Sequence, residues 1–176
     1  MVGSVCGYLD IETTGLSPHA AELTVVGLYV VPEGKPPSLF QPYGDQISPR
    51  LLRRLLSPID ILYTYNGRRF DLPFLEAKTG IAIEKKWRHE DLMYACWKQG
   101  LYGGLKGVER LLGIRRTTSD IDGWIAVQLW HNYRRRGDRT SLKRLLAYNR
   151  EDVVNLSRLR VSLSTSRTEV RSPAST

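Results

Sequence analysis

The sequence contains little cysteine and no long apolar run, and each shortage excludes a class of protein. Cys6 and Cys96 are its two cysteines. They are too few for a disulfide framework, so we expect a reducing, cytoplasmic setting. The longest apolar run, residues 23–31, is far shorter than the roughly 20 residues that cross a bilayer. No basic segment followed by an apolar one opens the chain, so neither a secretory signal nor a membrane partner is expected.

The histidines and glycines do not form ligand patterns either. His19, His89 and His131 lack a metal-ligand spacing, and we expect His89 to have a packing or supporting role. The glycines between residues 100 and 107 lack the Lys-Ser or Lys-Thr pair of a phosphate-binding loop. Binding of a nucleoside triphosphate is therefore not expected.

What the sequence does contain is basic charge, most of it arginine. The 176 residues are 41 % hydrophobic and 25 % charged, as in a globular domain, and the net charge is +8. Residues 1–99 carry 11 basic and 11 acidic side chains, whereas residues 100–176 carry 15 and 7. Of the 26 basic residues, 19 are arginine, whose planar fork matches phosphate. An acidic polymer is therefore one natural partner, and a basic surface that serves only solubility is the alternative.

Hydrophobic periodicity predicts one α/β domain over residues 1–163, with a disordered tail over 164–176. Strands mostly precede helices, which predicts a mixed central sheet of about five strands flanked by helices and a helix-rich C-terminal half. The predicted strands are 5–12, 23–31, 38–43, 59–65 and a segment near 86–90. The predicted helices are 49–56, 70–79, 91–99, 105–112, 123–136 and 140–163.

The first candidate site is a pair of acids on the first predicted strand. Asp10 and Glu12 stand two residues apart, so both point to one face while Leu9 and Ile11 point to the other. Carboxylates this close repel each other unless a cation lies between them, which favours a divalent metal site. A solvated strand edge is the alternative, and the apolar neighbours argue against it.

The second candidate is Asp71, at the start of a predicted helix and shortly after Asn66-Gly67. Its alternative role is that of a carboxylate stabilised by the positive end of the helix dipole.

The third candidate lies on the long C-terminal helix. Tyr148 and Asp152 are four residues apart, hence on one face, and Asp152 adjoins the apolar stripe. A carboxylate there is costly unless it is paired or binds a metal. An ion pair with Arg150 or Lys143 is the alternative. Glu151, one position round the helix, is expected to face solvent.

These three stretches together resemble the DEDD family of 3′-to-5′ exonucleases, which have a ribonuclease-H-like fold. The matching features, in order, are acid-x-acid on the first strand, Asn-x-x-x-Phe-Asp in the middle and Tyr-x-x-x-Asp near the end. The last motif resembles the tyrosine subclass (DEDDy), because the histidine subclass has a histidine five residues before the final aspartate, where this chain has Ala147. The stretches from His89 to Leu92, Gly104 to Gly113 and Asp120 to Trp124 also resemble one branch of such nucleases.

The resemblance implies a catalytic site with two Mg²⁺ or Mn²⁺ ions. Asp10 would bridge both ions, and Glu12 and Asp152 would complete the site of the ion that activates water. Asp71 would help to hold the second ion, through water. Tyr148 would orient the attacking water with its hydroxyl group.

The resemblance further implies a partner, single-stranded nucleic acid with a free 3′ end, with DNA favoured over RNA. Leu16 would wedge against the terminal base, Asn66 and Phe70 would contact the next nucleotide, and Arg68 would meet backbone phosphates. The alternatives are that Leu16 and Phe70 belong to the core and that Asn66 only caps a turn. The predicted substrate-binding residues are Thr13, Thr14, Gly15, Leu16, Asn66, Arg68 and Phe70.

Two other functions compete with the exonuclease. One is a catalytically weak or inactive nucleic-acid-binding module of the same fold, and the other is a partner-binding domain of a larger assembly. Loss of one acid would favour the binding module, but all four carboxylates and the tyrosine are present.

Overall fold

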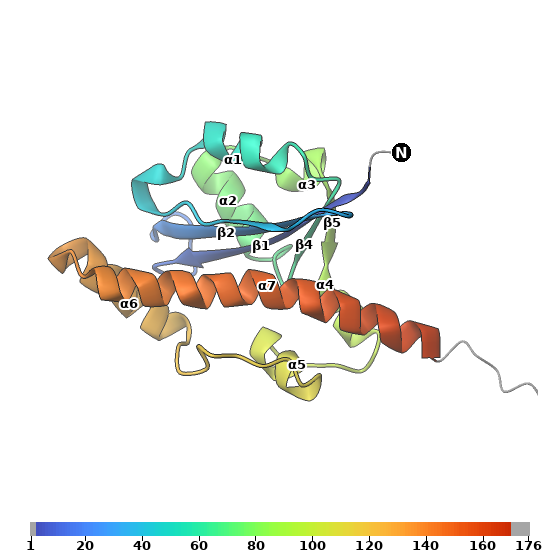
Figure 1. The fold of residues 1–176 in the computed structure, drawn as a ribbon. Helices are drawn as coiled ribbons and strands as arrows, with labels where there is room; N and C mark the ends of the chain where they lie inside the picture. Colours follow the sequence, from blue (N-terminus) through green and yellow to red (C-terminus); the bar gives the residue numbers. More distant parts are fainter. Residues whose placement is uncertain (1–2, 170–176) are drawn as a thin grey trace, which may run out of the picture.

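The structure is a computed structural model that describes residues 3–169, with side chains described up to residue 165 (Figure 1). The strands are β1 (Val5–Thr13), β2 (Leu23–Pro32), β3 (Ser38–Phe40), β4 (Ile61–Thr64) and β5 (Arg88–Asp91). A 3₁₀ turn, η1, covers Gly44–Gln46. The helices are α1 (Pro49–Leu56), α2 (Asp71–Thr79), α3 (Ile83–Lys86), α4 (Leu92–Trp97), α5 (Leu105–Leu111), α6 (Gly123–Arg136) and α7 (Arg139–Glu169). No helix in the described range is long and apolar enough to cross a membrane.

The five strands form one mixed sheet in the order β3-β2-β1-β4-β5. β1, β2 and β3 pair antiparallel, whereas β1, β4 and β5 run parallel. The predicted mixed five-stranded sheet is confirmed. The carboxyl ends of β1, β4 and β5 therefore meet at the same edge, where ligands bind in open α/β sheets.

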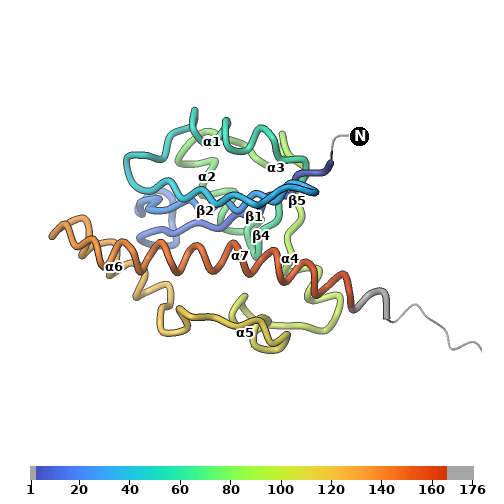
Figure 2. Tube along the Cα trace, viewed as in Figure 1, coloured from blue at the N-terminus to red at the C-terminus, as the bar shows by residue number. Residues whose placement is uncertain are grey.

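Helices cover both faces of the sheet. Figures 1 and 2 show α1, α2 and α3 on one side, and α7 running across the other side beside α6 and α4. Successive side chains of β1 point to opposite faces of the sheet, so they enter the two layers in turn. Leu9 and Ile11 pack into the core on the α1–α2 side, and Cys6 and Tyr8 pack into a second core beneath α7. The acids of β1 share the register of Tyr8 and so face α7.

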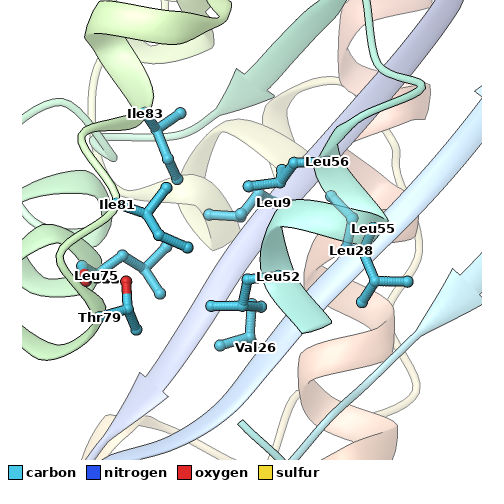
Figure 3. A pocket seen from close by; sticks show the side chains of 10 residues that line it. All are labelled: Leu9, Val26, Leu28, Leu52, Leu55, Leu56, Leu75, Thr79, Ile81 and Ile83. Atoms are coloured by element: carbon cyan, nitrogen blue, oxygen red, sulfur yellow. Dashed lines mark hydrogen bonds between the residues drawn. The ribbon is translucent and has the colours of Figure 1, made fainter. Parts of the chain in front are cut away.

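The core on the α1–α2 side is apolar throughout. Figure 3 shows the side chains around a small pocket there, which come from β1, β2, α1, α2 and the segment from Ile81 to Ile83. Its one polar side chain, Thr79, donates a hydrogen bond to the carbonyl of Leu75 over 2.6 Å. Because the Thr79 hydroxyl is already bonded, the lining of this pocket presents no polar side chain that is free to bind or react with a ligand.

Several elements in the first half differ from the sequence-based prediction by one or two residues at their ends, and two differences are larger. The strand predicted over 38–43 ends at Phe40, because Pro42 has no N–H to donate to a ladder, and Tyr43 meets Val25 through an isolated bridge. A short helix, α3, forms where the sequence pattern predicts no element. Neither difference moves a candidate site residue.

The long helix α7 extends further than predicted. It continues past residue 163 to Glu169, so 164–169 are helical and not part of a disordered tail. The hydroxyls of Ser164 and Thr165 bond to carbonyls four residues back, which suits an exposed helix end without an apolar stripe. The rest of the predicted tail, 170–176, lies outside the described residues.

Candidate metal centre

Three carboxylates from two elements converge between the sheet and α7. One oxygen each from Asp10, Glu12 and Asp152 lies within 4.8 Å of the others. Glu12 and Asp152 are buried and Asp10 is half-buried. β1 supplies the first two side chains and α7, packed across β1, supplies the third. The strand period placed the first two acids on one face, and the resemblance to DEDD exonucleases implied that Asp152 joins them.

Asn149 supports Asp10 from α7 and was not among the predicted site residues. Its amide nitrogen lies 3.1 Å from Asp10 Oδ2, and its amide oxygen accepts from Gln41 over 3.0 Å. Asn149 is fully buried, and it reaches β1 because Gly27 pairs opposite Asp10 in β2. A Cβ at Gly27 would collide with the Asn149 amide. The signal in the sequence was a lone glycine in an apolar strand, which marks a close approach.

Asp71 lies next to this group but is not one of its three members. Its Oδ1 accepts from the backbone N–H of Ile11 over 3.0 Å, between the two acids of β1. β4 pairs with β1 only as far as Tyr8, so the carboxylate satisfies an N–H that has no strand partner. Asp71 also lies in the first turn of α2, so the helix-dipole role holds as well.

The cluster strongly favours a cation. Burial and then the neighbouring carboxylates raise the pKa of Asp10 and of Glu12 well above their ordinary values. Burial raises the pKa of Asp71 to about 7. For Asp152, burial outweighs the nearby Arg116 and raises the pKa to about 6. Glu12 Oε1 is buried and has no hydrogen-bond partner. Mg²⁺ and Mn²⁺ prefer oxygen ligands, and three carboxylates supply them here, so the residues fit such an ion.

We expect the metal-free protein to lose stability as the pH rises. A raised pKa in the folded state means that folding favours the protonated acid. The contribution of Asp71 is therefore fully present below a pH of about 4 and is lost as the pH rises through about 7. Urea denaturation in EDTA at pH 5 and pH 8 should show wild type losing at least about 1.4 kcal/mol more than Asp71→Asn, which is roughly one pKa unit.

Addition of Mg²⁺ or Mn²⁺ at pH 8 should reverse that loss, because the ion replaces the proton between the carboxylates. At pH 5 the same ion should have less effect, since protons compete for the acids. Equal pH slopes for wild type and Asp71→Asn would contradict the electrostatic account of this site.

Arg116 is the cation that pairs with Asp152, in place of Arg150 or Lys143, which the ion-pair alternative named. Its guanidinium lies 2.6 Å from Asp152 Oδ1 and meets both oxygens of Glu109 at 2.9 and 2.8 Å. Glu109 is fully buried. Arg116 lies 36 residues before Asp152, in the connection between α5 and α6, so no periodic signal in the sequence could pair them.

Glu151 is bound and not solvated, which corrects the prediction for it. The loop before α6 wraps its carboxylate: the backbone N–H groups of Thr117 and Thr118 donate over 2.7 and 2.9 Å. Both threonine hydroxyls donate to it as well. These bonds outweigh burial and lower the pKa of Glu151. Glu151 thus anchors the segment that carries Arg116.

Two cations lie against the ring of Tyr148. The Lys106 ammonium lies 4.8 Å from its ring centroid and the Arg116 guanidinium lies 5.5 Å from it. Lys106 also donates to the carbonyl of Ile121. Burial, then Asp152, raises the pKa of Tyr148 far above its usual range, so its hydroxyl stays protonated. Lys106 lies in the stretch from Gly104 to Gly113, which resembles one branch of nucleases. Nothing in the sequence indicated that Lys106 contacts Tyr148.

The loop after β1 holds the first group of predicted substrate residues. The Thr13 hydroxyl donates to the carbonyl of Gly15 over 2.8 Å. The N–H of Thr14 is already bonded to Glu22, so it is not free for a ligand. Leu16 is 86 % exposed, which excludes the alternative that it belongs to the core.

The turn before α2 holds the other group. Asn66 has a positive φ of 60°, and its N–H and that of Arg68 donate to the two oxygens of buried Asp91. The Arg68 side chain pairs with Glu84 at 2.9 Å. Phe70 is half-buried against the α1–α2 core, so the core alternative holds for part of its ring.

Comparison with known proteins gives the family context. A family model described as the RNase_H superfamily matches residues 7–164. Bacillus subtilis (strain 168) YprB, described as uncharacterized, is 30 % identical over 173 residues. That match covers 89 % of this chain and 41 % of YprB, so the chain spans less than half of that relative.

Solved structures of similar fold include DNA-processing and nuclease proteins. The family B DNA polymerase of Pyrobaculum calidifontis has a TM-score of 0.64 at 15 % identity, covering 91 % of this chain and 26 % of the polymerase. Brucella melitensis NrnC with bound Mg²⁺ has a TM-score of 0.58 at 23 % identity, covering 91 % of this chain and 72 % of NrnC. NrnC bound to pGG has a TM-score of 0.56 at 22 % identity, with the same coverage. At such identities the likeness shows the shared fold alone.

Proposed function

Because this chain belongs to the RNase_H superfamily, we propose that it is a metal-dependent 3′-to-5′ exonuclease of the DEDD class, tyrosine subclass. Its substrate is single-stranded nucleic acid with a free 3′ end, DNA in preference to RNA. The observation that carries the proposal is the group of three carboxylate oxygens within 4.8 Å of one another. Such a group, with raised pKa values and an unpartnered oxygen on Glu12, supports divalent cations better than any purely structural role.

The similar folds support the same class of ligand. NrnC has been solved with Mg²⁺ and, separately, with pGG. Transferred to this chain, those two ligands correspond to a metal at the acid triad and a nucleotide beside it. The match covers 41 % of YprB, so the proposed chemistry corresponds to one part of that longer relative.

The acids of the site have distinct tasks in this proposal. Asp10, Glu12 and Asp152 would hold two Mg²⁺ or Mn²⁺ ions, and Asp71 would support the second ion from its place beside Ile11. When bound, the ions supply Lewis-acid activation of water and stabilise the leaving oxygen. Asn149 holds Asp10, and Arg116 holds Asp152, so both carboxylates are oriented before the substrate arrives.

Tyr148 orients the attacking water and does not take its proton. Its raised pKa keeps the hydroxyl protonated at neutral pH, so Oη can donate a hydrogen bond to a water oxygen. Lys106 and Arg116 fix the ring through cation–π contacts. A tyrosinate base is therefore not part of the mechanism.

The predicted substrate residues flank the acids on the proposed path of the strand. Exposed Leu16 is placed to wedge against the terminal base. The Thr13–Gly15 turn seats that nucleotide through its backbone groups other than the Thr14 N–H, which is bonded to Glu22. The exposed part of Phe70 stacks on the next base, and Asn66 holds the turn that presents it. Arg68 reaches a phosphate once it leaves Glu84.

The direct test is the polarity of digestion. A single strand carrying a label at its 5′ end should yield a ladder that shortens one nucleotide at a time with Mg²⁺. The same strand labelled at its 3′ end should release labelled mononucleotide at once, and a blocked 3′ end should resist digestion. Retarded mobility without shortening would exclude the exonuclease and favour the binding module. Digestion from the 5′ end would contradict the proposed 3′-to-5′ polarity.

A further inference from the structure

A broad polar groove lies on the α7 side of the sheet, beyond the acid cluster. It has a volume of about 820 Å³ and runs between β5, α4 and the C-terminal half of α7. Figures 1 and 2 show these three elements side by side. The acids and Tyr148 do not line it, so it is separate from the proposed metal centre.

The groove is lined by more positive than negative charge. Its cations are Arg68, Arg88, Lys98 and Arg160. Arg88 and Lys98 are exposed, so they are open to a ligand in solution. Of the groove acids, exposed Glu90 pairs with Arg88 at 3.1 Å, whereas Asp91 is buried and bonded to backbone N–H groups. The excess of cations favours a ligand with repeated negative charge.

Arg160 is the cation whose surroundings point most clearly to an anionic ligand. Its guanidinium lies 4.6 Å from the ring centroid of Tyr63 and donates to the Tyr8 hydroxyl over 3.4 Å. Within the part of the chain whose side chains are described, no carboxylate lies within 4.0 Å of it. A half-buried guanidinium held only by neutral groups keeps its full charge for a phosphate.

Two parts of the chain connect the groove to the proposed metal centre, the turn before α2 and the helix α7. Arg68 belongs both to the groove and to the turn that precedes Asp71. On α7, Arg160 follows Asp152 by eight residues, which is about 12 Å along the helix axis. At roughly 3.4 Å per stacked nucleotide, three or four nucleotides span that length.

We infer that this groove binds the phosphodiester backbone of the substrate strand on the 5′ side of the nucleotide being removed. The inference rests on the proposed function and deepens it, because it gives the enzyme a contact that only strands longer than a few nucleotides can make. A dinucleotide fills the metal centre without reaching Arg88, Lys98 or Arg160 in the groove.

The test reverses charge at two exposed groove positions, Arg88→Glu with Lys98→Glu. The matched control, Arg50→Glu with Arg53→Glu, makes the same charge change on α1, on the opposite side of the sheet. KM with Mg²⁺ is measured for a dinucleotide and for a 12-nucleotide strand. Kd for the 12-nucleotide strand is measured between 50 and 200 mM salt in an Asp10→Asn background, where binding is read without cleavage.

The groove variant should raise KM and Kd for the 12-nucleotide strand about tenfold or more. It should also reduce the slope of log Kd against log salt by about 1.4, since each phosphate contact contributes about 0.7 for single strands. KM for the dinucleotide should change less than about twofold. The α1 control variant should have the KM of wild type for both substrates. Arg160→Gln should weaken binding of the 12-nucleotide strand by a similar factor. Its thermal unfolding midpoint should stay above the assay temperature, so that the loss of binding is not a loss of fold.

An unchanged long-strand Kd, or an equal loss with the α1 control, would overturn the groove assignment. An equal rise in KM for the dinucleotide would overturn it too. Absence of cleavage by wild type, together with a groove-dependent Kd, would instead defeat the exonuclease proposal and leave the groove standing.

Discussion

Asp10→Asn is expected to abolish strand shortening, with a loss of about 10³-fold or more, while the fold is retained. Asp10 belongs to the acid triad and accepts a hydrogen bond from Asn149. An asparagine has the same shape and can still accept from that amide, but it carries no negative charge for a cation. The substitution therefore removes the electrostatic function and leaves the packing.

The stability of the variant distinguishes this account from simple damage. Burial and three neighbouring carboxylates raise the pKa of Asp10, so its charge destabilises the metal-free protein at pH 8. Metal-free Asp10→Asn should then be at least as stable as wild type in urea at that pH. Asp45→Asn, whose carboxylate is almost fully exposed at η1, serves as control and should keep full activity. Turnover by Asp10→Asn at the rate of this control would refute the site assignment.

Arg116→Met is expected to lower the free energy of unfolding by about 3–5 kcal/mol. The substitution leaves Glu109 buried without a cation and also frees Asp152, which Arg116 holds at 2.6 Å. Removing one partner of a buried pair costs far more than the pair itself contributes, because a bare charge remains in the interior. Metal-dependent activity should fall as well, since Asp152 loses its orientation.

Two further variants separate the causes of that loss. Arg116→Met combined with Glu109→Met removes both buried charges and should recover most of the stability, but not the activity. Arg144→Met, which breaks an exposed pair with Asp120, should cost less than about 1 kcal/mol. Urea denaturation measures all three. A loss for Arg116→Met no larger than that of Arg144→Met would contradict the buried-network account.

The sequence was sufficient to predict the parts of the fold that depend on local patterns. The alternation of Leu9, Asp10, Ile11 and Glu12 fixed which face of β1 carries the acids, and the stripe of α7 put Asp152 beside the apolar core. Those two local patterns did not show that the three acids meet; that expectation came from the order of the motifs, which resembles DEDD exonucleases.

Long-range polar contacts were not predictable in the same way. Asn149 reaches Asp10 from 139 residues away, and Arg116 meets Asp152 from the connection between two helices. Such contacts depend on how the helices cross the sheet. The hydrophobic periodicity of one segment carries no information about that crossing. Glu151 was misjudged for the same reason, because the loop that binds it carries no apolar or helical pattern.

The most direct test of the central claim is a titration of Mn²⁺ into metal-free wild type and Asp10→Asn at pH 8, where the carboxylates are ionised. The account predicts saturable binding to wild type and an affinity at least about tenfold weaker for Asp10→Asn, since one shared ligand is lost. Saturable binding of equal affinity to both proteins, or none to wild type, would contradict the claim that Asp10, Glu12 and Asp152 form a metal centre.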